Sequence, residues 1–123
     1  MQEATDAYTK VGKITRTPRD LEASLLLKAA SQLQSIKDNW GSESEKLEEA
    51  LLYNRKLWTI FMSTITQADN PMPIDVKNNI ASLGAFVLHQ TLVVQNGPGT
   101  SDMLTSLISI NRELAAGLHA SAA

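Results

Sequence analysis

The chain contains no cysteine and only two histidines, His89 and His119, among its 123 residues. The absence of cysteine excludes disulfides, thiolate nucleophiles and thiolate metal sites, and it is typical of proteins from a reducing compartment. Neither histidine has a carboxylate three residues before it, so the Glu-x-x-His pattern of di-metal helical bundles is missing. We therefore expect no metal, no cofactor and a cytoplasmic location.

Positive charge is neither in excess nor clustered in this sequence. The 11 Lys and Arg residues are balanced by 13 Asp and Glu residues, and the formal net charge is −2. Because nucleic-acid binding depends on a basic surface, we expect no direct contact with nucleic acid. The chain also has no glycine-rich phosphate loop and no Gly-x-Ser-x-Gly nucleophile turn. These absences predict a protein that is not an enzyme and has no catalytic residues.

One long interval, residues 78–101, contains no Asp, Glu, Lys or Arg. A membrane-spanning helix needs about 20 mainly apolar residues. Here His89, Gln90, Thr91 and Gln95 interrupt the apolar run, and Gly97 and the residues after it end the helix early. We therefore expect no membrane insertion, and we interpret the interval as a helix covered by the rest of the domain or by a partner.

Turn and capping residues divide residues 1–123 into helices, and no segment alternates apolar and polar residues as a strand does. Thr17 and Pro18 are typical of a helix start, and Ser42 with Glu45 matches a capping box. The predicted helices cover residues 3–14, 18–39, 43–67, 74–95 and 101–118. Because the connections are short, the sequence predicts a single all-α domain, an antiparallel four-helix bundle with an additional short N-terminal helix.

The third predicted helix carries an unusually wide apolar surface. Its apolar residues Leu57, Trp58, Ile60, Phe61, Met62 and Ile65 cover well over half of the helix circumference. The fourth helix is similar, with Phe86 outside its main apolar stripe. Either these two helices form the centre of the bundle, or one side of them receives an amphipathic helix from a partner.

Two asparagines, Asn54 and Asn111, occupy positions on these stripes where an apolar residue is expected. One interpretation is a buried amide pair that fixes the relative position of two helices. The other is that both amides are presented to a partner helix. Arg55 and Arg112 follow directly, each about 100° further around its helix, and we expect both on the rim of the same surface.

Several segments together resemble the flagellar biosynthesis regulator FlaF of alphaproteobacteria. The similar segments, in chain order, are Tyr8 with Val11, residues 18–30, residues 51–61 with Asn54-Arg55-Lys56-Leu57-Trp58 at their centre, residues 70–73, residues 79–84 and residues 108–118 with Ile110-Asn111-Arg112. They cover nearly the whole chain. The Asn-Arg-x-Leu-Trp block and the Ile-Asn-Arg segment with its Gly117-Leu118 ending are the specific parts.

The resemblance implies a small cytoplasmic protein without catalysis that binds flagellin before export, as a secretion chaperone does, and works opposite the translational repressor FlbT. The leading hypothesis is that it holds the terminal helices of flagellin. The predicted partner-binding residues are Asn54, Arg55, Trp58, Phe61, Met62, Phe86, Asn111 and Arg112. The alternatives are an adaptor that binds FlbT without touching flagellin, and control through flagellin mRNA.

Overall fold

The computed structural model describes residues 17–97 and 99–122, and this part of the chain is entirely helical, without strands. Four long helices dominate: α2 (Pro18–Asp38), α4 (Leu47–Ile65), α5 (Ile74–Asn96) and α6 (Thr105–Ala122). Short helical segments, α3 (Trp40–Glu43), η1 (Ser44–Lys46) and η2 (Ser101–Leu104), lie in the connections. The all-α class predicted from the sequence is confirmed. The additional helix predicted at residues 3–14 lies outside the described residues.

The start of α2 follows directly from its local sequence. The hydroxyl of Thr17 accepts a hydrogen bond from the Asp20 backbone N–H at 3.1 Å, and the Asp20 carboxylate accepts one from the Thr17 N–H at 3.4 Å. Pro18 occupies the first turn, where its missing N–H costs nothing. At the other end of the chain, α6 continues to Ala122, past the predicted end at residue 118, and His119 Nδ1 lies 3.0 Å from Asp20 Oδ1.

The helix predicted at residues 43–67 begins differently in the structure. Asn39 ends α2, and the chain turns at once into α3, so Ser42 lies inside a helical turn. Its hydroxyl donates to the Asn39 carbonyl at 3.3 Å. The predicted Ser42–Glu45 capping box is therefore wrong, because Ser42 is itself part of helix α3 and does not stand at the N-cap of the long helix. The long helix itself starts at Leu47, without a side-chain cap.

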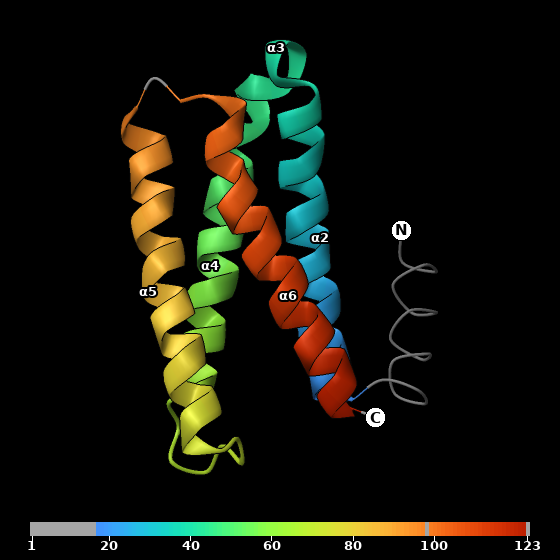
Figure 1. Ribbon diagram of the computed structural model, residues 1–123, viewed down its shortest axis with the longest axis vertical. Coiled ribbons are helices and arrows are strands. Elements are labelled where there is room, and N and C mark those ends of the chain that lie inside the picture. Colours follow the sequence, from blue (N-terminus) through green and yellow to red (C-terminus); the bar gives the residue numbers. More distant parts are fainter. Residues whose placement is uncertain (1–16, 98, 123) are drawn as a thin grey trace.

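The long helices lie side by side, and in Figure 1 the chain runs up α2, down α4, up α5 and down α6. The most extensive contact is between α2 and α6, followed by the contacts of α4 with α2 and with α5. In Figure 1, α6 slants away from α5 toward α2, and the contact between α5 and α6 is correspondingly small. α5 is thus covered chiefly on the side that faces α4.

The core lies between the four long helices. Its largest fully buried side chains come from α2, α4 and α6 together with η2: Leu26, Leu33, Leu51, Trp58, Ile65, Leu104 and Leu107. Close helix packing is visible at Gly84 of α5, where an added Cβ would lie 2.5 Å from Met62 Sδ. Gly84 thus leaves room for the Met62 side chain between α5 and α4, and a larger residue here would require that flexible side chain to move.

Candidate partner-binding surfaces

The two stripe asparagines meet in the centre of the molecule. Asn111 Nδ2 donates to Asn54 Oδ1 at 2.7 Å and to the Leu26 carbonyl at 3.3 Å, and Trp58 Nε1 donates to Asn111 Oδ1 at 2.9 Å. Asn54, Trp58 and Asn111 are each 0% exposed. The structure therefore has the buried amide pair, and none of these three residues lies on a surface that a partner can touch.

The orientation of this network is set by the tryptophan. An indole N–H can only donate, so the atom of Asn111 that faces Trp58 must be its oxygen. The amide nitrogen of Asn111 then points to Asn54 and to α2, and Asn54 must present its own oxygen. The remaining Asn54 Nδ2 is buried without a hydrogen-bond partner. The network links α2, α4 and α6 at one level, which fixes their relative positions at the cost of one unpaired donor.

The two arginines are exposed, but on opposite sides of the molecule. Arg55 is seven residues before Met62, so both lie on the side of α4 that faces α5, where Met62 meets Gly84. Arg112 is seven residues before His119, which contacts Asp20 of α2. The expectation that Arg55 and Arg112 lie on the rim of one surface is therefore wrong. α4 and α6 run in the same direction and face each other through the asparagine pair. A step of about 100° in the same sense around each helix therefore turns Arg55 and Arg112 to opposite sides.

The three apolar residues predicted as partner anchors beside Trp58 lie in three different environments. Phe61 is 5% exposed and packs edge-on against Trp58, with ring centroids 6.2 Å apart and an interplanar angle of 84°. Met62 is half-buried against Gly84. Phe86 is 43% exposed. Of the predicted apolar anchors, Phe86 alone presents much of its side chain to solvent.

The outer face of α5 combines this exposure with an absence of charge. Phe86 and Val93 are seven residues apart and share one face, and Leu92 adjoins them; all three are exposed. His89 lies between them on the helix and is exposed as well. No Asp, Glu, Lys or Arg occurs from Asn78 to Ser101. We call Phe86, His89, Leu92 and Val93 the α5 face.

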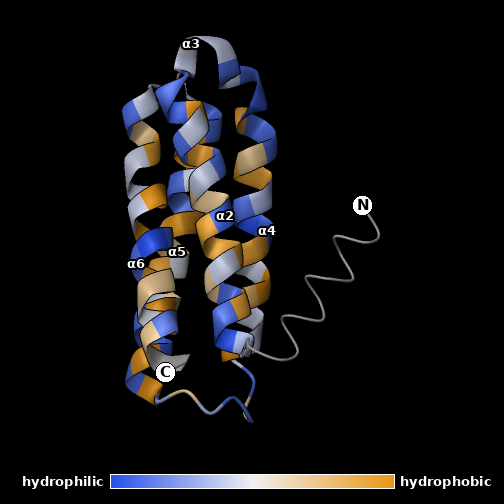
Figure 2. Cartoon of the chain, turned by 90° about the vertical axis from the view of Figure 1, so that its right-hand side faces the viewer, coloured by the Kyte–Doolittle hydropathy of each residue, from blue (hydrophilic) through white to orange (hydrophobic). Residues whose placement is uncertain are grey.

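A second apolar surface lies between α2 and α4, whose neighbouring positions are visible in Figure 2. It contains a small groove of about 110 Å³ that is lined by Glu22, Leu25, Leu26, Leu57, Ile60, Phe61 and Thr64. Ile60 on its edge is 66% exposed. Burial raises the pKa of the Glu22 carboxyl, while the nearby Arg19 charge lowers it. We call this the lower α2–α4 groove.

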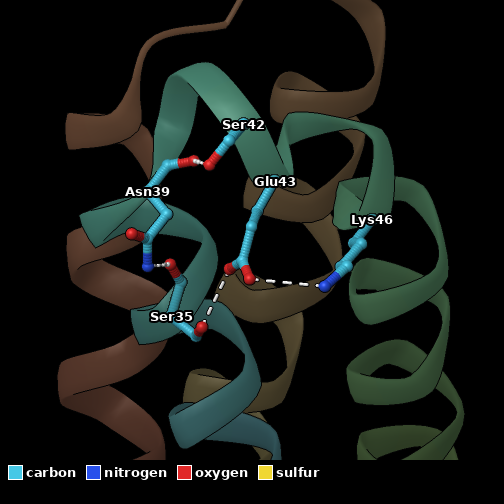
Figure 3. A network of polar contacts seen from close by, with 5 residues as sticks. All are labelled: Ser35, Asn39, Ser42, Glu43 and Lys46. Carbon is cyan, nitrogen blue, oxygen red and sulfur yellow. Dashed lines mark hydrogen bonds and ion pairs between the residues drawn. The ribbon is translucent and has the colours of Figure 1, made fainter.

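Toward α3, the same two helices together with α3 and η1 line a larger, open hollow of about 570 Å³, with Lys28, Glu43, Lys46 and Tyr53 in its lining. Figure 3 shows Glu43 between Ser35 and Lys46, with distances of 2.8 Å to the hydroxyl and 3.3 Å to the ammonium. These two contacts, the hydroxyl first, lower the pKa of Glu43. Lys28 Nζ lies 5.6 Å from the Tyr53 ring centroid. No sequence pattern predicts this hollow, because its residues come from segments with no motif in common.

In residues 17–97 and 99–122 no three His, Asp or Glu side chains are grouped so that they could hold a metal ion. Within the described helices, none combines the length and the hydropathy that crossing a bilayer requires. The described surface carries two apolar regions, the α5 face and the lower α2–α4 groove, together with the larger hollow beside α3.

A comparison with protein families matches residues 4–118 to a family model described as flagellar protein FlaF. The chain belongs to the FlaF family. Searches among curated proteins and among solved structures gave no match. The family resemblance inferred from the sequence is thus confirmed, and it identifies a flagellar protein.

The structure also shows what the two segments most specific to the family resemblance do in the fold. The Asn54–Trp58 block and the Ile110–Arg112 block lie far apart in the sequence. In the structure Asn111 receives a hydrogen bond from Trp58 and donates one to Asn54. In this FlaF-family protein the two segments therefore build the internal framework that positions the exposed faces.

Proposed function

We propose that this FlaF-family protein is a cytoplasmic flagellin-binding regulator and secretion chaperone. It promotes flagellin synthesis, export and filament assembly by holding the terminal helices of flagellin, with the α5 face as the contact surface. The observation that carries the proposal is the exposure of Phe86, Leu92 and Val93 on a helix without charge from residue 78 onward.

The α5 face suits an amphipathic helix as its guest. Phe86 and Val93 are about 10 Å apart along the helix axis, at 1.5 Å per residue, which equals two turns of a guest helix. An amphipathic helix places apolar residues at this same spacing, so its stripe can lie along the two anchors. Aromatic anchors such as Phe86 contribute strongly to interfaces of this kind. Flagellin termini are amphipathic helices that form coiled coils in the filament, and covering them would prevent early polymerisation.

Arg55 supplies a polar edge for such a contact. Gly84 and Met62 fix the level at which α5 and α4 meet. Leu92 is eight residues after Gly84, and Arg55 is seven residues before Met62, so both lie about two turns from that point. Since the two helices run in opposite directions, Arg55 and Leu92 are at the same height. The buried residues Asn54, Trp58, Phe61 and Asn111 act in this proposal as the framework and not as contacts.

Calorimetric titration of the purified protein with flagellin tests the proposal. We expect a complex at or below tens of micromolar. Changing Phe86 and Val93 together to Ser should weaken it about tenfold or more, because both anchors are lost. Ile60→Ser is the matched control, since it likewise replaces an apolar side chain that the described residues leave exposed, but Ile60 lies away from α5, between α2 and α4. The control should bind like the unaltered protein.

Three results would contradict this proposal. One is the absence of any heat or complex with flagellin at these concentrations. Another is equal weakening by the control variant, which would move the contact to the other side. A third is co-purification with FlbT from cells that lack flagellin genes, combined with no flagellin binding, which would favour the adaptor function. Salt-sensitive binding of flagellin leader RNA would favour control through mRNA.

A further inference from the structure

Among the described residues, the lower α2–α4 groove is an apolar surface that the proposed contact with flagellin does not use. Leu25 and Leu57 form its walls, and Ile60 and Leu21 beside it are 66% and 42% exposed. Leu25 and Leu57 are half-buried, and the described residues leave much of Ile60 and Leu21 uncovered. An exposed isoleucine at the edge of an apolar groove is a position where a further helix gains stability by docking.

We propose that the occupant is the N-terminal segment of the same chain, residues 3–14. This segment is predicted to form an amphipathic helix, with Ala7, Val11 and Ile14 on one side and Tyr8 beside them. An amphipathic helix of this size cannot persist alone in water and needs a surface on which to bury its apolar side.

The place where α2 begins gives the segment a short route to the groove. Thr17 precedes α2, and the groove begins at Glu22, five residues on, or about 8 Å along the axis at 1.5 Å per residue. It ends on α2 at Leu26, about 14 Å from Thr17. A helix of 12 residues is about 18 Å long, so residues 3–14 can cover the whole groove after a reversal at residues 15 and 16.

Charge also favours this occupant. Glu22 stands in the groove wall with its carboxyl partly withdrawn from water. The segment carries Lys10 and Lys13 next to its apolar side, and either can place an ammonium beside that carboxylate. A helix that brings cations to this edge compensates for the solvation that Glu22 loses on being covered. With the groove occupied from within the chain, the α5 face stays free for a partner.

The absence of cysteine makes a direct test simple, because any introduced thiol is the only one in the chain. Cysteine placed by Ile60→Cys should react with a maleimide about tenfold more slowly than cysteine placed by Leu92→Cys, although Leu92 is the less exposed of the two among the described residues. Adding Val11→Asp and Ile14→Asp should release the segment and bring the Ile60→Cys rate up to that of Leu92→Cys. The same two changes should leave the Leu92→Cys rate unchanged.

A pair of cysteines identifies the occupant. The double variant Val11→Cys with Ile60→Cys should form an intramolecular disulfide on mild oxidation, and Val11→Cys with Leu92→Cys should not. Equal labelling rates at positions 60 and 92 in the intact chain would overturn the proposal. So would a disulfide-linked dimer, which would assign the groove to a second copy, or slow labelling of position 60 only when flagellin is added. The proposed flagellin contact is tested at other residues and can fail independently.

Discussion

The centre of α4 and the outer face of α5 have similar compositions and opposite environments. Trp58 and Phe61 on α4 are 0% and 5% exposed, whereas Phe86 on α5 is 43% exposed. All three belong to helices with wide apolar surfaces. The difference shows that the amount of apolar surface on a helix does not determine how much of it is buried; the number of neighbouring helices does.

The packing explains this difference. α4 has α2 and α5 as direct neighbours, and its inward side reaches α6 through the bond between Trp58 and Asn111. α5 has extensive contact with α4 and little with α6, because α6 slants toward α2 (Figure 1). A residue on the far side of α5 therefore meets solvent. We expect mutations on the two helices to lower the free energy of unfolding by very different amounts.

The largest difference is expected between Phe61→Ala and Phe86→Ala. Removing the ring of Phe61 empties space beside Trp58 and should lower the free energy of unfolding by about 3–5 kcal/mol. Phe86→Ala should lower it by less than about 1 kcal/mol, since no comparable cavity forms. Urea unfolding followed by circular dichroism measures both values. Similar losses for the two variants would mean that the α5 face is covered in the free protein.

A smaller but still large loss is expected for Asn111→Ala. The change leaves the Trp58 N–H and the Asn54 carbonyl oxygen buried without partners, and it should cost about 2–4 kcal/mol. Asn79→Ala, at an exposed position on α5, is the matched control and should stay within about 0.5 kcal/mol of the original protein. Thermal and urea unfolding of the pair give the comparison. An Asn111→Ala protein of unchanged stability would show that the amide network does not hold α4 and α6 in position.

The smallest expected effect is a change in how the stability depends on pH. The folded state lowers the pKa of Glu43, so the unfolded state binds the proton more readily and the stability from this carboxylate rises with pH. That contribution is complete above the ordinary value of about 4.5 and is lost as pH falls through the lowered pKa. Glu43→Gln should therefore flatten the acid limb of the stability curve below about pH 5, while Glu45→Gln at an exposed position serves as its control. Parallel curves for Glu43→Gln and the original protein would contradict the contacts with Ser35 and Lys46.

Much of the helical structure could be predicted from short-range features. The Thr17–Asp20 cap, Pro18, and Pro73 before Ile74 determine where α2 and α5 begin within a residue or two, because caps act through atoms three residues apart. The start of α4 could not be predicted in this way. Ser42 and Glu45 have the spacing of a capping box, but Ser42 lies inside the short helix that follows Asn39, where its hydroxyl donates to the Asn39 carbonyl, and the long helix begins only at Leu47.

The candidate site was harder to predict than the fold. Asn54 and Asn111 stand out in the sequence because they occupy positions on apolar stripes, but their pairing is a contact across 57 residues and depends on how α4 and α6 are placed. The separation of Arg55 from Arg112 depends on the relative direction of those helices. The hollow around Glu43 joins residues of α2, α3, η1 and α4 that share no pattern.

By itself, the sequence determined that the chain is helical, where several helices begin, which stripes are apolar, and that it belongs with flagellar proteins of the FlaF type. These properties rest on interactions between residues a few positions apart, or on motifs that can be recognised in the sequence. Only the tertiary structure decided that Trp58 is buried and Phe86 is exposed, and that a groove lies between α2 and α4. The reason is that a helix with a wide apolar surface can be covered on any of several sides. Because α6 slants toward α2, the outer side of α5 is the one that stays uncovered.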